Sequence, residues 1–147
     1  MVSGESRVAG SGSCDLHLLE PDDEIIVEIR LPGWPAGRHW GFQEFARRRG
    51  DFALAAAALF YDMDTSGRAT NAHVGVIGVA DRPLRLPSVE AVLNGAVIDD
   101  ATIAEAEAAT TAAIDPDGDI HASGGYRKAL AGTMVERALK MAAEQTP

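Results

Sequence analysis

The chain has 147 residues, 46% of them hydrophobic and 24% charged, and a formal net charge of −9. This length and composition predict a globular protein with its own core, and the acidic charge argues against binding to nucleic acid or to anionic membranes. The single cysteine, Cys14, excludes an internal disulfide and a cysteine-ligated metal cluster. Without an apolar leader or a membrane-length apolar run, the sequence predicts a cytoplasmic protein.

Strand patterns dominate the first half of the chain. Residues 1–18 predict a flexible lead-in, because their first part is rich in Gly and Ser, and residues 19–147 predict a single domain. Alternating hydrophobicity predicts strands at residues 23–31 and 40–46. In the second strand, one face is expected to carry Trp40, Phe42 and Glu44.

Residues 52–63 carry conflicting signals. Four consecutive alanines favour a helix, but residues 62–67 read as a hairpin turn and residues 73–79 as a glycine-spaced strand. Because a hairpin turn needs strands on both sides, the sequence predicts a strand at 52–63. Its small side chains are expected to allow helices to pack closely above it.

Helical periodicity follows the strands. The sequence predicts a short helix at 88–93 capped by Ser88, and a second helix to about residue 113 capped by Asp99 or Asp100. A third helix is predicted at 123–144. Strands followed by helices indicate an α+β fold, with an antiparallel sheet of three to four strands and three helices packed on one face.

Five stretches, in order, resemble one known domain: residues 19–31, 42–53, 75–85, 90–95 and 119–139. The domain is the C-terminal domain of the medium, flavin-carrying subunit of molybdenum hydroxylases, the family of carbon monoxide dehydrogenase and xanthine dehydrogenase. The resemblance implies the α+β fold described above. It also implies that iron–sulfur and molybdenum sites belong to other subunits.

In that family, glycine-rich loops of the preceding domain hold the flavin pyrophosphate, and the sequence shows no such loop here. We therefore expect no cofactor on this chain alone, with FAD present only where a separate flavin domain is a partner. No metal-ligating residues are predicted.

Three possibilities for the function remain open at this point. The first is a repurposed, cofactor-independent enzyme of specialised metabolism that cyclises or rearranges a small apolar metabolite or catalyses its cycloaddition. A homodimer is the expected assembly for this class. The second is the C-terminal part of a split medium FAD subunit that docks on a separate flavin domain. The third is a fragment without activity of its own.

For the first class, the polar group at the start of the third helix supplies the catalytic candidates. His121 could act as acid or base, Tyr126 could donate a hydrogen bond, and Arg127 could bind an anionic oxygen. The alternative is that these three side chains cap and pack the helix. Expected substrate-binding residues are Trp40, Phe42, Glu44, Tyr61, Arg49 and Asp51.

Two aspartate clusters invite a metal interpretation. Asp62, Asp64 and Ser66 match half of a calcium loop, but His73 stands where the final glutamate should fall, so a hairpin turn is favoured. Residues 115–119 carry three aspartates that could ligate a cation. Helix capping, with carboxylates near the start of the third helix, is favoured over a cation site.

Overall fold

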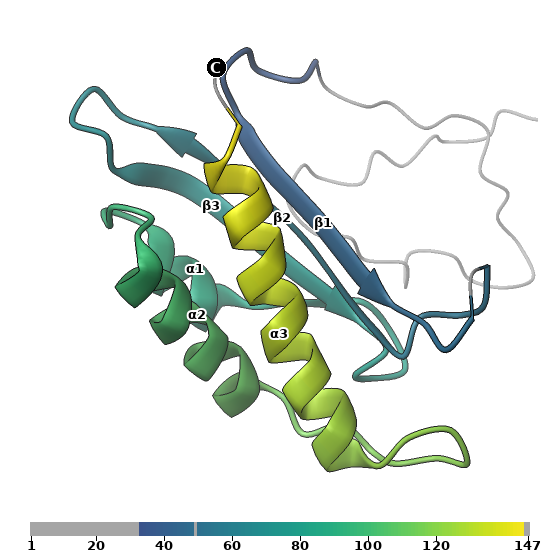
Figure 1. Ribbon diagram of the computed structural model, residues 1–147. Coiled ribbons are helices and arrows are strands. Elements are labelled where there is room, and N and C mark those ends of the chain that lie inside the picture. The colour runs from purple at the N-terminus through teal and green to yellow at the C-terminus, as the bar shows by residue number, and fades with distance from the viewer. Residues whose placement is uncertain (1–32, 49, 146–147) are drawn as a thin grey trace, which may run out of the picture. The chain divides into compact units, whose positions relative to one another are not determined.

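A four-stranded antiparallel sheet carries three helices on one face, within the part of the chain that the structure describes (Figure 1). The computed structural model describes residues 33–48 and 50–145. The strands lie in chain order: β1 (His39–Phe45), β2 (Ala55–Met63), β3 (Ala69–Ile77) and β4 (Leu84–Arg85). The helices are α1 (Pro87–Leu93), α2 (Asp100–Ala113) and α3 (Gly124–Ala143). The predicted α+β fold is confirmed.

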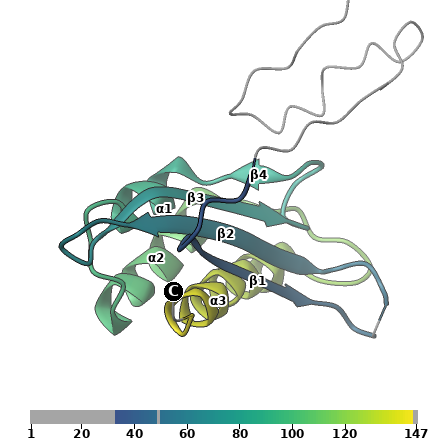
Figure 2. The same cartoon turned by 90° about the horizontal axis from the view of Figure 1, so that it is seen from above.

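Three predicted strands are confirmed with shifted ends. β2 starts at Ala55, three residues later than predicted, and β3 starts at Ala69, four residues earlier. β4 is only two residues long and was not predicted; it lies beside β3, at the opposite edge of the sheet from β1 (Figure 2). The predicted lead-in at 1–18 and strand at 23–31 lie outside the described residues.

The β2–β3 hairpin turn is built around one aspartate. The Oδ1 atom of Asp64 accepts hydrogen bonds from the backbone N–H groups of Ser66 (2.8 Å) and Arg68 (2.9 Å) and from the Ser66 hydroxyl (2.7 Å). Gly67 has a φ of 76°, a left-handed conformation that glycine adopts without strain. The turn prediction for this segment is therefore confirmed.

The helix starts agree with one of the two predicted side-chain caps, and α3 has a cap that was not predicted. The side chain of Asp99 accepts from Thr102 N at the start of α2, and that of Ser123 accepts from Tyr126 N at the start of α3. The prediction that Ser88 caps α1 is wrong. Pro87 begins this helix one residue earlier, since its fixed φ suits the first helical position.

The core lies between the sheet and the helices. Ala55, Ala57 and Leu59 of β2 point to the helices and are buried. The small alanine side chains let α3 lie close to the sheet, as the sequence predicts. At Gly41 of β1, the approach is so close that an added Cβ would overlap the carbonyl oxygen of Ala138 in α3.

Across residues 33–48 and 50–145, none of the helices combines the length and the apolar character needed to cross a bilayer.

Candidate functional site

The face of the sheet that the helices leave uncovered gathers the largest exposed side chains of the strands. We call it the open sheet face. The strand register aligns its residues in three rows across β1, β2 and β3. The rows are Trp40–Phe60–His73, Phe42–Ala58–Gly75 and Glu44–Ala56–Ile77. The face is therefore mainly aromatic and aliphatic, with Glu44 at one edge and Arg85 of β4, which pairs with Gly75, at the other.

An arginine and an aspartate hold one end of this face together. The guanidinium of Arg38 donates two hydrogen bonds to the Asp62 carboxylate, at 2.7 and 2.8 Å. The same guanidinium lies 4.3 Å from the ring centre of Phe60 and 5.4 Å from that of Trp34. Phe60 also stacks on His73, with ring centres 4.6 Å apart. This arrangement neutralises the charge of Arg38 and makes the end of the face rigid.

The Arg38 hydrogen bonds lower the pKa of Asp62 to about 2, although partial burial acts in the opposite direction. A hydrogen bond from the Asn71 side chain, 2.9 Å long, adds to the lowering. The carboxylate is therefore charged at any pH at which the protein is normally handled.

This low pKa leads to an expected pH dependence of stability. Because the folded-state pKa of Asp62 lies below the unfolded value, its contribution is present above about pH 4 and is lost as the pH falls towards 2. Asp62→Asn is expected to lower the free energy of unfolding by about 1 to 2 kcal/mol at pH 7 and to flatten its fall between pH 4 and pH 2. Urea titrations at several pH values measure this. The exposed Asp117→Asn is the control and should leave both quantities unchanged.

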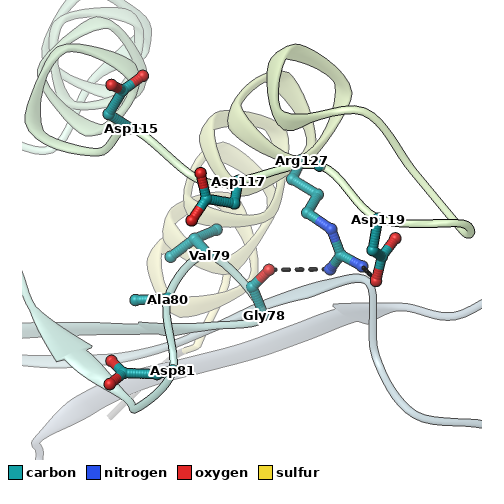
Figure 3. A pocket seen from close by; sticks show the side chains of 9 residues that line it. Gly78, Val79, Ala80, Asp81, Asp115, Asp117, Asp119 and Arg127 are labelled. Carbon is teal, nitrogen blue, oxygen red and sulfur yellow. Dashed lines mark hydrogen bonds and ion pairs between the residues drawn. The ribbon is translucent and has the colours of Figure 1, made fainter.

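The start of α3 forms a second polar region, centred on Arg127. Its Nη1 atom donates to the carbonyl oxygens of Leu54 and Gly78, each at 2.9 Å, and its Nη2 atom donates to Asp119 at 2.7 Å. Only 11% of the Arg127 side chain is exposed. Figure 3 shows the guanidinium reaching from α3 towards Gly78 and Asp119. Arg127 thus ties the segments next to β2 and β3 to the loop before α3.

An open pocket of about 610 Å³ adjoins this contact. The hydrogen bond from Arg127, followed by those from the backbone N–H groups of His121 and Ala122, lowers the pKa of Asp119 to about 2. Together with Asp81, Asp115 and Asp117, the charged Asp119 makes the pocket lining acidic, and Arg127 is the basic residue in it. It is lined by Gly78, Val79, Ala80, Asp81, Asp115, Asp117, Gly118, Asp119 and Arg127 (Figure 3).

Of the three catalytic candidates, Arg127 alone lines the pocket. His121 is exposed and contributes its backbone N–H to Asp119. Tyr126 is 47% exposed. Ser123 provides the side-chain cap that the alternative interpretation gave to His121. The hydrogen bonds of the Arg127 side chain hold the start of α3 to Leu54, Gly78 and Asp119.

The expected substrate-binding residues do not form one surface. Trp40, Phe42 and Glu44 share the open sheet face, as the alternation predicts. Tyr61 belongs instead to the opposite face, where it is 1% exposed and stacks on His39 with ring centres 5.1 Å apart. Burial beneath the helices raises the pKa of its hydroxyl.

The remaining two candidates fall on the connection between β1 and β2. Arg49 lies outside the described residues. Asp51 is exposed and forms a loose ion pair with Arg47, with 4.0 Å between Nη2 and Oδ2. The sequence analysis missed Arg38 and Phe60. The only sequence signal for Phe60 was its place in the predicted strand, two residues before Asp62, where the predicted turn begins.

The helix starts in the described region do not fit the pyrophosphate of a bound FAD. Such a group needs free backbone amides at a helix N-terminus without neighbouring negative charge. α1 carries Glu90 in its first turn, α2 starts beside the carboxylates of Asp99 and Asp100, and α3 follows the acidic pocket. Gly78 is a packing glycine, because an added Cβ would press on the backbone of Leu54.

Comparison with known proteins decides the family. Residues 40–142 match the family described as CO dehydrogenase flavoprotein C-terminal domain. The chain belongs to this family. The resemblance on which the sequence analysis relied is thereby confirmed.

The relatives of this CO dehydrogenase flavoprotein C-terminal domain are subunits of larger enzymes. Subunit alpha of the 6-hydroxypseudooxynicotine dehydrogenase complex of Paenarthrobacter nicotinovorans is 35% identical, over 81% of this chain and 40% of the relative. The carbon monoxide dehydrogenase medium chain of Afipia carboxidovorans is 33% identical, over 84% of this chain and 42% of the relative. The chain thus spans about two fifths of the length of the curated relatives it matches.

Solved structures show the same fold. Carbon monoxide dehydrogenase from Hydrogenophaga pseudoflava superposes with a TM-score of 0.72 at 30% identity, covering 77% of this chain and 39% of that chain. Quinoline 2-oxidoreductase from Pseudomonas putida 86 gives 0.68 at 37% identity, covering 75% and 38%.

These relatives overturn the first function hypothesis. A cofactor-independent enzyme that cyclises an apolar metabolite is wrong for this chain, since the relatives are medium chains and subunits of dehydrogenases and hydroxylases. A small apolar metabolite, a homodimer and a role in specialised metabolism find no support in them. The family is a flavoprotein family, so the expectation of no cofactor is not supported either.

Proposed function

We propose that this domain completes a medium flavoprotein subunit and acts within a molybdenum hydroxylase complex. The observation that carries the proposal is the family match over residues 40–142. Relatives with this domain are named as medium chains of carbon monoxide dehydrogenase and as a medium subunit of nicotine 6-hydroxylase. In this function, the domain is a structural and electrostatic neighbour of the flavin and takes no substrate of its own.

In this proposal, the rest of the subunit holds the FAD. The acidic helix starts of the domain disfavour a phosphate, so the pyrophosphate belongs on the preceding part of the subunit. The resemblance to the family implies that the connection between β1 and β2, with Arg47 and Asp51, lies towards the flavin. Both side chains are accessible, and their 4.0 Å ion pair is loose enough to rearrange against a partner.

Co-expression tests the proposal. The full chain would be produced together with the flavin-binding part of the Hydrogenophaga pseudoflava carbon monoxide dehydrogenase medium chain, the part that this chain does not match. We expect a yellow complex with equal amounts of the two chains and the absorbance of FAD. The chain purified alone should be colourless.

Two outcomes contradict the proposal. A chain that binds FAD by itself would show that the phosphate site lies within it. Failure of the two chains to purify together would remove the role as a subunit component.

Asp51→Asn within the complex should leave the stability of the chain unchanged, because exposed ion pairs contribute little, but should alter the flavin spectrum.

A further inference from the structure

We propose that α1 takes the place of a strand along β3 and so keeps this edge of the sheet from pairing with a second copy of the chain. The inference does not rest on the proposed function. It concerns the edge of β3 that β4 leaves uncovered, because β4 is only two residues long. α1 follows β4 and lies along the same side of β3 (Figure 2).

Two side chains from α1 and its C-terminal end bind the backbone of β3. The N–H group of Val74 donates to the carboxylate of Glu90 at 3.0 Å, and the N–H group of Ala72 donates to the side-chain oxygen of Asn94 at 2.9 Å. In a sheet, such outward N–H groups donate to the carbonyl oxygens of a neighbouring strand. Glu90 and Asn94 therefore supply the acceptors that a strand would supply.

The spacing of these residues explains why a helix can replace a strand here. Residues four apart in an α-helix are separated by about 6 Å along its axis, and residues two apart in a strand by about 7 Å. Glu90 and Asn94 are four apart, and their partners Val74 and Ala72 are two apart in the opposite direction. α1 thus runs along β3 as an antiparallel strand would.

Backbone hydrogen bonds continue the pairing on both sides of the helix. After the helix, Gly95 N donates to the carbonyl oxygen of Ala69 at 2.7 Å, and Ala69 N donates to that of Ala96 at 2.8 Å. Before the helix, Leu86 N donates to the carbonyl oxygen of Val74 at 2.8 Å. The closed part of the edge therefore extends beyond both ends of α1.

The composition of β3 indicates what an open edge would bind. Its residues, Ala69–Ile77, include no proline and no Asp, Glu, Lys or Arg. Uncharged strands of this kind pair readily with identical strands when their edges are exposed, and a covering helix is one way in which proteins prevent this. A second copy of β3 is therefore the occupant that α1 excludes.

Hydrogen exchange of the full chain, read by NMR at the amides of Ala72 and Val74, tests the inference. Ala91→Pro interrupts α1 at an exposed position, because proline cannot continue a helix. Both amides are expected to exchange roughly tenfold faster or more in dilute solution and to become protected again as the protein concentration rises. The control Ala91→Lys keeps the helix and should match the wild type at every concentration.

A second pair of variants tests the acceptor by itself. Asn94→Ala removes the acceptor of the Ala72 amide and leaves the helix in place. This amide should therefore exchange several-fold faster, at a rate that does not depend on the protein concentration. Asn94→Asp keeps an acceptor oxygen at the same position and should retain the protection.

Two results would overturn the inference. If Asn94→Ala leaves the exchange of the Ala72 amide unchanged, the side chain does not replace a strand acceptor. If the amides exposed by Ala91→Pro stay exposed at every concentration, α1 does not guard the edge against a second copy. Should Ala91→Pro fail to fold, Ala91→Gly decides the second point, because glycine loosens a helix much less than proline does.

Discussion

Replacing Gly41 by alanine is expected to lower the free energy of unfolding by roughly 3 kcal/mol. The added Cβ would overlap the carbonyl oxygen of Ala138, and neither backbone can give way without moving β1 away from α3. The contact between these two elements joins the edge of the sheet to the longest described helix. A fall in the urea midpoint, followed by circular dichroism, measures the loss.

A second strand glycine provides the matched control. An alanine Cβ at Gly75 would lie 3.7 and 3.8 Å from the nearest backbone oxygens, which is ordinary contact. Gly75→Ala is therefore expected to keep the stability or to raise it by up to about 1 kcal/mol, since it restricts the unfolded chain. Equal effects at the two positions would show that the close approach of α3 at Gly41 is not what matters.

Replacing Arg127 by methionine is expected to cost about 3 kcal/mol. The substitution leaves the carbonyl oxygens of Leu54 and Gly78 without this donor and removes the ion pair of Asp119. Arg127→Lys should recover only part of the loss, because an ammonium cannot reproduce the planar fork that reaches all three acceptors. Urea titration of the three proteins gives the comparison.

Arg137 serves as the control for this substitution. It lies on the same helix and is exposed, and its side chain forms no hydrogen bond or ion pair within the described part of the chain. Arg137→Met should change the stability by less than about 0.5 kcal/mol. A similar loss for both variants would mean that helix charge, and not the Arg127 contacts, determines the result.

The residues of the candidate site show where sequence reasoning succeeds. The two-residue period of a strand correctly placed Trp40, Phe42 and Glu44 on one face, because successive side chains point to opposite sides of the sheet. In β2, both faces of the alanine run are apolar, so the pattern could not tell which side faces the helices. Tyr61 was therefore assigned to the face that Phe60 in fact occupies.

The role of Arg127 could not be read from the sequence for a different reason. Its carbonyl partners lie 73 and 49 residues away in the chain. Local patterns report only neighbours within a turn or a strand, and contacts at such separations depend on how the elements pack. The same holds for Arg38, whose partner Asp62 is 24 residues away.

By itself, the sequence determined the order and type of the elements and the family, because hydrophobic period, turn residues and caps act over a few residues. Asp99 and the turn at residues 62–67 were recognised in this way. Only the tertiary structure decided which aromatic side chains stay exposed and which arginines form hydrogen bonds to distant parts of the chain. Those properties follow from strand register and helix docking, which long-range contacts set, and they determine the surface that this domain offers to a partner.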